Sequence, residues 1–163
     1  MFWGAFTWGA HTQLVVVSQD PTSDRKGVTA RVILEMYQEH LPQILEVGQK
    51  FVQDNAPVHT AYIVDEWVEE WCREHGVEVI EWPPYSPDLS PIENVWAILK
   101  QRLYKQFPEL ASLLKSKASL EMLINAAKHV WDTFEDEELE NLIDSMPDCI
   151  EAVVQAKGWY TRY

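Results

Sequence analysis

The chain has 163 residues, of which 47% are hydrophobic and 24% are charged; this length and composition are typical of one folded domain and exclude a disordered tail or a fibrous protein. The 13 Lys and Arg residues are outnumbered by 26 Asp and Glu residues, and the resulting formal net charge of −13 excludes non-specific binding of a polyanion by the surface as a whole, so that any contact with nucleic acid must be local. The two cysteines match no disulfide framework, and the sequence has no basic leader, so we expect a protein that is not secreted and is nuclear or otherwise intracellular. It has no apolar run of roughly 18 residues, so we expect no membrane-spanning segment.

The first half of the chain is predicted to alternate short strands with helices. β-Branched and aromatic residues on both sides of Gly9 indicate an antiparallel hairpin. Apolar residues at helical spacing then indicate two helices, one before and one after a short strand that leads to Asp54. Gly76 is expected to end the second helix, and an alternating pattern after it indicates another strand. The predicted strands are 2–8, 13–18, 50–53 and 77–82, and the predicted helices are 29–45 and 60–75.

The second half of the chain is predicted to be helical after a proline-rich loop. Four prolines between positions 83 and 91 exclude a regular element and indicate a rigid, extended loop, and Pro91 is suited to the first position of a helix. The predicted helices are 91–107, 119–134 and 137–157. We therefore expect an α/β protein with helices packed on a sheet and a helical C-terminal end. Residues 1–163 are expected to form a single domain, with the strands and helices of the core in 1–107 and the C-terminal helices in 118–157.

Two acids lie where the predicted elements would hold them in place. Asp54 follows a strand, at the carboxyl edge where open α/β sheets bind ligands. Glu93 lies in the first turn of the helix after the proline loop, where the helix dipole favours a carboxylate. Two such carboxylates can share a hard divalent cation such as Mg²⁺, which suits phosphoryl chemistry. Because the chain has 26 acids, the spacing alone equally fits a turn residue and a helix-terminus acid.

The residues around both acids point to one family. Residues 51–60 read FVQDNAPVHT and residues 82–96 read WPPYSPDLSPIENVW, and both segments resemble signature blocks of mariner-type DDE transposases. The resemblance extends over essentially the whole chain. It implies an RNase H-like catalytic core in which Asp54 and Glu93 are catalytic and hold Mg²⁺ or Mn²⁺ ions that activate water or a DNA 3′-hydroxyl. It also implies that the partner is DNA, at transposon ends.

The sequence departs from this family pattern near its start. In the family, the first catalytic Asp lies on the first strand of the core, upstream of the segment that resembles residues 2–5, and the resemblance assigns no such residue here. Asp20 and Asp24 lie in a polar loop and are expected to be turn residues. We therefore expect a core that lacks its first strand, weak or absent cation binding, and no DNA cleavage by this chain alone. We also expect the hairpin to pair with the strand before Asp54, or a second chain to fill the gap as a homo-oligomer or by strand exchange. The remaining alternative is a marginally stable chain that aggregates through its exposed strand edges.

Three functions remain open from the sequence. The Asp54 and Glu93 blocks favour a fragment of a DDE transposase that performs metal-dependent DNA cleavage and strand transfer. The missing first Asp favours a degenerate or domesticated module that binds nucleic acid or protein without catalysis. A glycosidase that uses Asp54 and Glu93 as acid and base requires carboxyl groups about 5 to 9.5 Å apart, and no other feature supports it.

Four further residues are candidate DNA contacts. His59 can orient a phosphate or the Asp54 carboxylate, or it can bond to the backbone as a helix-entry residue. Residues 100–117 contain five cations and one acid, so Lys100, Arg102 and Lys105 either meet DNA phosphates or form a solvated helix face. Residues 132–151 contain nine acids and neither Lys nor Arg, and we expect this segment to repel DNA and to face protein or solvent.

Overall fold

The computed structural model describes residues 1–24, 27–84, 86–113 and 115–159, and these residues form two compact units. Unit 1 comprises residues 1–3 and 15–84, and unit 2 comprises residues 4–14 and 86–159. The predicted N-terminal hairpin is divided between them, because its base belongs to unit 1 and its tip belongs to unit 2.

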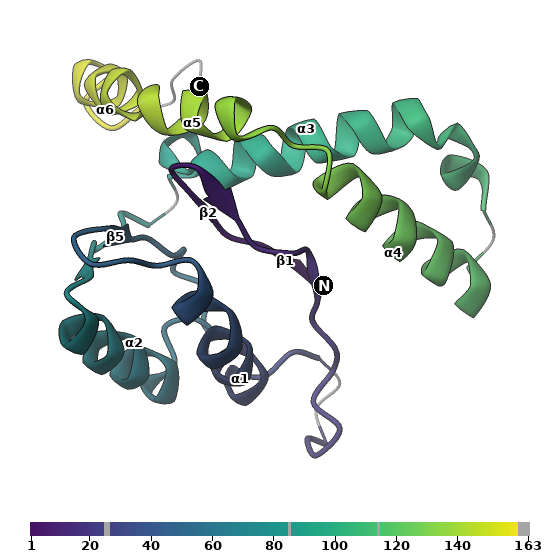
Figure 1. Ribbon diagram of the computed structural model, residues 1–163, viewed down its shortest axis with the longest axis horizontal. Coiled ribbons are helices and arrows are strands. Elements are labelled where there is room, and N and C mark those ends of the chain that lie inside the picture. Colours follow the sequence, from purple (N-terminus) through teal and green to yellow (C-terminus); the bar gives the residue numbers. More distant parts are fainter. Residues whose placement is uncertain (25–26, 85, 114, 160–163) are drawn as a thin grey trace. The chain divides into compact units, whose positions relative to one another are not determined.

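Unit 1 combines two small sheets with two helices (Figure 1). The helices, α1 and α2, lie side by side. One sheet is an antiparallel pair of strands from the hairpin, and the other is a parallel pair that joins the strand before Asp54 to the strand after α2. The elements are β1 (Phe2–Trp3), β4 (Val15–Val16), α1 (Ala30–His40), β5 (Lys50–Phe51), α2 (Tyr62–His75) and β6 (Glu78–Val79). This order of strands and helices confirms the predicted one.

The core of unit 1 is formed by one face of each helix and by apolar residues of the strands. The buried residues of α2 are four positions apart, and in α1 Met36 and Tyr37 lie three and four positions after Ile33, which places the buried residues on one side of each helix. Burial of this apolar surface is the main stabilising contribution to such a core. The buried core residues are Val17, Ile33, Met36, Tyr37, Leu41, Phe51, Val64, Val68, Cys72 and Val77.

The ends of α1 and α2 follow from the local sequence. The first helix is predicted over 29–45 but stops at His40, and a 3₁₀ turn, η1 (Leu41–Gln43), follows it. Pro42 explains the difference, because proline has no N–H and its ring clashes with the carbonyl group four residues earlier in an α-helix. The second helix ends at Gly76 as predicted, and the φ of 66° at Gly76 is a left-handed conformation that glycine adopts without strain.

Asp20 stabilises the loop that leads into α1. Its Oδ1 accepts hydrogen bonds from the backbone N–H and the hydroxyl of Thr22, at 2.8 and 2.7 Å, and its Oδ2 accepts one from the Thr29 hydroxyl at 2.7 Å. These hydrogen bonds favour the ionised form and lower the pKa of Asp20 from its ordinary value to about 2. Both oxygens of Asp20 are therefore engaged in the structure of this loop.

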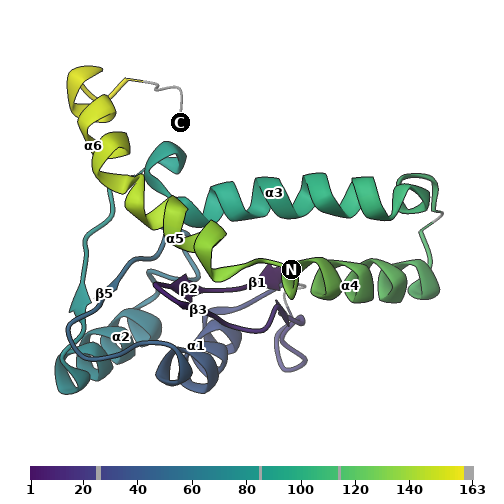
Figure 2. The same ribbon diagram turned by 45° about the horizontal axis from the view of Figure 1, so that its top comes forward.

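Unit 2 is mostly helical (Figure 2). α3 and α4 lie side by side, and α5 packs against α3 and against a short antiparallel sheet made by the tip of the hairpin. Two 3₁₀ turns precede and follow α3. The elements are β2 (Phe6–Thr7), β3 (Ala10–His11), η2 (Pro87–Leu89), α3 (Pro91–Gln106), η3 (Pro108–Ser112), α4 (Lys117–Trp131), α5 (Asp136–Asp144) and α6 (Met146–Gln155).

Two sequence predictions for unit 2 need correction. The single helix predicted over 137–157 is wrong, because α5 and α6 are separate helices and Pro147 stands at the start of α6, where its missing N–H and fixed φ are tolerated. The loop before α3 is not extended throughout, because η2 forms one turn within it. The helical C-terminal end is confirmed.

Trp131, at the end of α4, is the largest fully buried side chain of unit 2. Its ring is 1% exposed and stacks on Trp96 of α3 with the ring centroids 5.3 Å apart. Its indole Nε1–H donates a hydrogen bond of 2.7 Å to the backbone carbonyl of Thr12 in the hairpin. A methyl group added at Gly4 would come within 2.6 Å of this ring, so only glycine fits there. Trp131 thus joins the helices of unit 2 to the tip of the hairpin.

The predicted pairing between the hairpin and the strand before Asp54 is wrong for the described residues. There β1 pairs with β4 and β5 pairs with β6, so that each sheet has two strands. The sheets are therefore smaller than the predicted core sheet. Within the described part of the chain, no helix has both the length and the apolar character needed to cross a bilayer.

Candidate functional site

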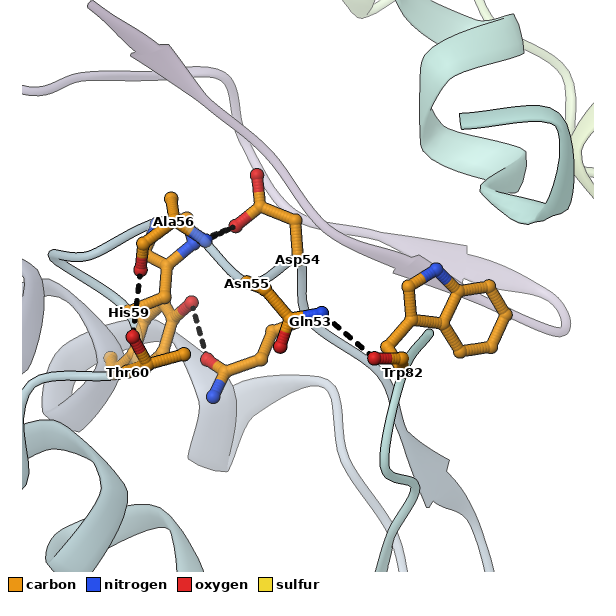
Figure 3. Close-up of polar contacts among 8 residues, drawn as sticks. Gln53, Asp54, Asn55, Ala56, His59, Thr60 and Trp82 are labelled. Carbon is orange, nitrogen blue, oxygen red and sulfur yellow. Dashed lines mark hydrogen bonds and ion pairs between the residues drawn. The ribbon is translucent and has the colours of Figure 1, made fainter. Parts of the chain in front are cut away.

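Asp54 lies in a loop that follows β5, at the carboxyl end of a parallel pair of strands. The side-chain amide of Asn55 donates a hydrogen bond of 2.7 Å to the carbonyl of Trp82 in the segment after β6, which links the carboxyl ends of both strands (Figure 3). A turn follows, in which the backbone N–H groups of His59 and Thr60 donate to the carbonyl of Ala56 at 2.8 and 3.0 Å. The predicted position of Asp54 at this edge is confirmed.

The two carboxylate oxygens of Asp54 have different environments. Oδ1 accepts a hydrogen bond of 3.1 Å from the backbone N–H of Ala56 and lies within hydrogen-bonding distance of Nδ1 of His59. Oδ2 has no hydrogen-bond partner in the described part of the chain, and in Figure 3 it points away from the loop. The Asp54 side chain is 65% exposed. One oxygen is therefore held by the protein and the other faces outward.

His59 lies at the end of the turn with its ring mostly inside unit 1. The side chain is 16% exposed, and its ring packs beside the ring of Tyr37 with the centroids 5.9 Å apart. Nε2 is buried and has no hydrogen-bond partner among the described residues. Of the roles left open by the sequence, the structure shows the contact with the Asp54 carboxylate.

Tyr37 of α1 supports the same loop and is not among the site residues predicted from the sequence. Its hydroxyl donates a hydrogen bond of 3.1 Å to the side-chain carbonyl of Gln53. Burial, with a smaller effect of the nearby negative charge of Asp54, raises the pKa of Tyr37 above its ordinary value, so the hydroxyl keeps its proton. A tyrosine on a buried helix face needs a polar partner for its hydroxyl, and this was the available signal.

Glu93 lies in the first turn of α3, as predicted. Its side chain is exposed, whereas Val95, Leu99 and Leu103 on the opposite side of the helix are buried in unit 2. Pro91 occupies the first position of the helix, where the absence of an N–H has no cost. Asp54 belongs to unit 1 and Glu93 to unit 2, and the binding of one cation by both carboxylates stays a prediction.

The three cations of α3 differ in their surroundings. Arg102 donates a hydrogen bond to Glu138 of α5, and its guanidinium lies over the ring of Phe134, 4.7 Å from the ring centroid. The hydrogen bond from Arg102 lowers the pKa of Glu138 below its ordinary range. Lys100 and Lys105 are exposed. The structure thus gives Arg102 a partner inside unit 2 and leaves the two lysines on the surface.

The Asp54 carboxylate fits a hard divalent cation as one member of an incomplete ligand set. The outward Oδ2 is an oxygen donor of the kind that Mg²⁺ and Mn²⁺ prefer. The described residues contain no cluster of three or more His, Cys, Asp or Glu side chains that could hold a metal ion. Asp54 therefore suits the role of one ligand, and further oxygens must come from elsewhere.

The region of the chain that matches a family of known proteins includes both acids. Residues 6–114 match the family described as DDE superfamily endonuclease. The matched range includes Asp54 and Glu93 and extends over parts of both units.

Several curated relatives are transposases of nematodes. The chain is 37% identical over 119 residues to the transposable element Tc1 transposase of Caenorhabditis elegans. The matched region covers 72% of this chain and 39% of that protein. It is 29% identical over 161 residues to the Tc3 transposase of the same species, covering 97% and 44%. It is also 29% identical over 168 residues to the Tcb2 transposase of Caenorhabditis briggsae, covering 100% and 54%. The chain thus spans about half the length, or less, of these relatives.

A solved structure has the same fold. The crystal structure of the Mos1 strand transfer complex matches 94% of this chain and 40% of that chain, with a TM-score of 0.64 and 24% sequence identity. This likeness supports the predicted α/β fold class in its coarse form, a mostly helical protein with small sheets and a helical C-terminal end.

Proposed function

Because this chain belongs to the DDE superfamily of endonucleases, we propose that residues 1–163 form part of a catalytic domain that cleaves and joins DNA by metal-dependent phosphoryl transfer. The observation that carries the proposal is the Asp54 carboxylate, which follows a parallel strand within the matched range and presents one oxygen outward. Glu93 supplies the second carboxylate from the first turn of α3. The substrate proposed from the names of the relatives is the DNA of a transposable element.

In this proposal Asp54 and Glu93 would hold Mg²⁺ or Mn²⁺. A bound cation of this kind lowers the pKa of a coordinated water or hydroxyl and neutralises charge on a phosphate. The protein's own contribution is to place these acids: the Ala56 N–H and His59 contact Asp54 Oδ1, and the start of α3 at Pro91 fixes the backbone position of Glu93. Carboxylates in defined positions would hold a cation that in turn orients a reacting phosphate.

The two units are proposed to belong to one RNase H-like catalytic domain. The match to the endonuclease family runs through both units, and the fold similarity to the solved transposition complex covers 94% of the chain. In this proposal each unit supplies one acid ligand, Asp54 from unit 1 and Glu93 from unit 2. Residues 1–163 contribute two acids to this site, and a third oxygen ligand is proposed to come from another segment or from a second chain in a homo-oligomer or strand exchange.

A manganese titration tests whether the two acids share one ion. Mn²⁺ broadens the NMR signals of nearby amides, so the backbone amides of residues 53–56 and 91–94 are expected to broaden at the same Mn²⁺ concentrations in the 163-residue chain. Glu93→Gln is expected to weaken the broadening at residues 53–56, because removal of one carboxylate leaves the ion with fewer ligands. Glu109→Gln, which changes another exposed acid of unit 2, is the matched control and is expected to have no effect.

Independent broadening of the two segments, or broadening at 53–56 that Glu93→Gln leaves unchanged, would contradict a shared ion.

A second experiment incubates the same preparations with supercoiled plasmid DNA. No nicking is expected, because an ion bound by only two acids lacks the ligands needed to activate the attacking water. Nicking that requires Mn²⁺ and disappears in Glu93→Gln would show that residues 1–163 contain a third ligand.

The exposed side of α3 is the proposed DNA contact. Lys100 lies two turns after Glu93 on the same side of the helix, about 10 Å along its axis at 1.5 Å per residue, and Lys105 lies further along and is also exposed. A lysine at this distance can bind a phosphate near the one at the metal site. Arg102 and His59 already have protein partners, so the proposal depends on the two lysines.

The double substitution Lys100→Gln/Lys105→Gln is expected to weaken binding to a short DNA duplex and to flatten its salt dependence. Each phosphate contact contributes about 0.9 to the slope of log affinity against log salt, so the slope is expected to fall by about 2. Fluorescence anisotropy at several salt concentrations measures it. Lys128→Gln, an exposed lysine of α4, is the control. An unchanged slope would remove α3 from the DNA contact, and DNA binding without any Mn²⁺ site would favour the non-catalytic module.

A further inference from the structure

The two ring nitrogens of His59 have unlike environments in the described part of the chain. Its Nε2 is buried without a hydrogen-bond partner among the described residues, although an unpaired buried polar atom is unfavourable. The interactions that the structure gives the ring are the pair between Nδ1 and Asp54 and the packing against Tyr37. The ring is therefore oriented toward the carboxylate at the expense of its other nitrogen.

The turn between the two residues brings them together. The backbone N–H of Ala56 donates to Asp54 Oδ1 at 3.1 Å, and the carbonyl of Ala56 accepts from the N–H groups of His59 and Thr60 at 2.8 and 3.0 Å. The Asn55 side chain ties the loop to Trp82 at 2.7 Å. These backbone contacts place His59 against Asp54 without the need for a distant part of the chain.

The His59 contact divides the carboxylate into two unlike oxygens. Oδ1 receives both the Ala56 N–H and His59 Nδ1, whereas Oδ2 has no partner in the described ranges of the chain. Because the Asp54 side chain is 65% exposed, without these contacts it would be expected to rotate among several conformers. With both contacts in place, rotation of the carboxylate would break two hydrogen bonds at once.

The pair also determines which nitrogen of His59 carries a proton. A proton on Nδ1 makes an attractive N–H···O contact with Asp54 Oδ1, whereas its absence would set a lone pair of nitrogen against a lone pair of a carboxylate oxygen. The Nδ1–H form is therefore the one that fits the geometry.

We propose that His59 is a positioning residue for Asp54: its Nδ1–H holds Oδ1 in the protein, so that Asp54 offers a divalent cation the single oxygen Oδ2. The ligation by Asp54 is then monodentate, and His59 does not itself bind the cation or a phosphate. Supporting partners of this kind typically change metal affinity by 10- to 100-fold when they are removed. This inference rests on the proposed function of Asp54 as a metal ligand.

The test compares two substitutions of His59 in the 163-residue chain. His59→Leu keeps an apolar side chain beside Tyr37 but has no donor, and it is expected to weaken Mn²⁺ binding, followed by broadening of the amides of residues 53–56, by about 10-fold. In His59→Asn the side-chain N–H can take the place of Nδ1–H. The Mn²⁺ affinity of this variant is expected to lie within about threefold of that of the original chain, whereas loss of a supporting partner lowers it about 10-fold. A merely structural role of the ring would not be rescued by the smaller asparagine.

His40→Leu is the matched control, because His40 is a histidine of the same unit in a similar setting. Its side chain is 19% exposed, its ring stacks on the aromatic ring of Trp3, and its Nε2 lies 4.0 Å from a carboxylate oxygen of Glu39. It is expected to leave Mn²⁺ affinity unchanged. A second readout uses the original chain alone: the ¹⁵N spectrum of the His59 ring is expected to show a proton on Nδ1.

The outcomes separate this inference from the proposed function. If Asp54→Asn leaves Mn²⁺ binding at residues 53–56 intact, the proposed function of Asp54 fails. If Asp54→Asn removes that binding but His59→Leu does not weaken it, the proposed function stands and the role of His59 is refuted. If circular dichroism shows that His59→Leu does not fold, the test depends on His59→Asn and on the ¹⁵N spectrum of the ring. A proton on Nε2 alone would overturn the inference. Loss of Mn²⁺ binding at residues 53–56 in His59→Asn would also overturn it.

Discussion

Replacing Trp131 with alanine (Trp131→Ala) is expected to unfold unit 2 under mild conditions. The ring is 1% exposed, stacks on Trp96 and packs edge-on against Phe134 at 5.8 Å. Truncation of a buried Trp to Ala typically costs about 3 to 5 kcal/mol through the cavity it leaves. The loss also removes the Nε1–H donor of the buried Thr12 carbonyl, and an unsatisfied buried acceptor costs about 1 to 3 kcal/mol more.

This loss is comparable with the whole stability of an ordinary domain, about 5 to 15 kcal/mol. Urea unfolding followed by far-ultraviolet circular dichroism is the measurement. Trp131→Phe keeps an aromatic ring without the N–H. Its free energy of unfolding is expected to lie between those of the original chain and of Trp131→Ala. Trp8→Ala is the matched control, because Trp8 is 54% exposed in the same unit. A free energy of unfolding for Trp131→Ala within about 1 kcal/mol of the original would contradict the central place of this ring, since core truncations of this size cost more.

The substitution Asp54→Asn is expected to raise the dissociation constant for Mn²⁺ by at least about 100-fold, or about 2.7 kcal/mol. The amide is neutral and presents an NH₂ group in place of one oxygen, so the outward position loses its negative charge or its donor atom. Paramagnetic broadening of the amides of residues 53–56 measures the effect. Asp65→Asn, which changes an exposed acid of α2 in the same unit, is the control for non-specific binding of cations by a chain of net charge −13.

Two outcomes would count against the assignment of Asp54. One is an equal loss of affinity in Asp65→Asn, which would show that the acidic surface as a whole attracts Mn²⁺. The other is unchanged broadening in Asp54→Asn. Because Asp54 Oδ1 also accepts from the Ala56 N–H, circular dichroism and the amide spectrum of the loop must first show that the turn persists in the variant.

The sequence predicted the order of the elements because that order depends on local patterns. Apolar spacing placed the helices and strands, and Gly76 ended α2 as expected. Most errors were also local in origin: Pro42 and Pro147 interrupt helices that apolar spacing alone would continue. The pairing of strands was different, because the partner of a strand is set by contacts between distant segments, and among the described residues the hairpin and β5 form separate sheets.

The same division applies to the candidate site. The two acids stood out from the sequence through the residues beside them, since FVQDNAPVHT and SPIENVW are continuous segments. Tyr37 did not, because nothing in α1 shows that its hydroxyl will meet Gln53 after β5. Arg102 was grouped with Lys100 and Lys105 as a cation of one helix, but its partner Glu138 lies 36 residues further along the chain.

By itself, therefore, the sequence determined the order of the elements and singled out the two acids as candidates. Only the tertiary structure decided which side chains those acids and cations contact. For His59 the sequence left three roles open, and burial of its ring beside Tyr37 turned Nδ1 toward Asp54. The physical reason is that a helix or a turn is encoded by residues a few positions apart, whereas a side chain's partner is selected by which surfaces pack together and exclude water.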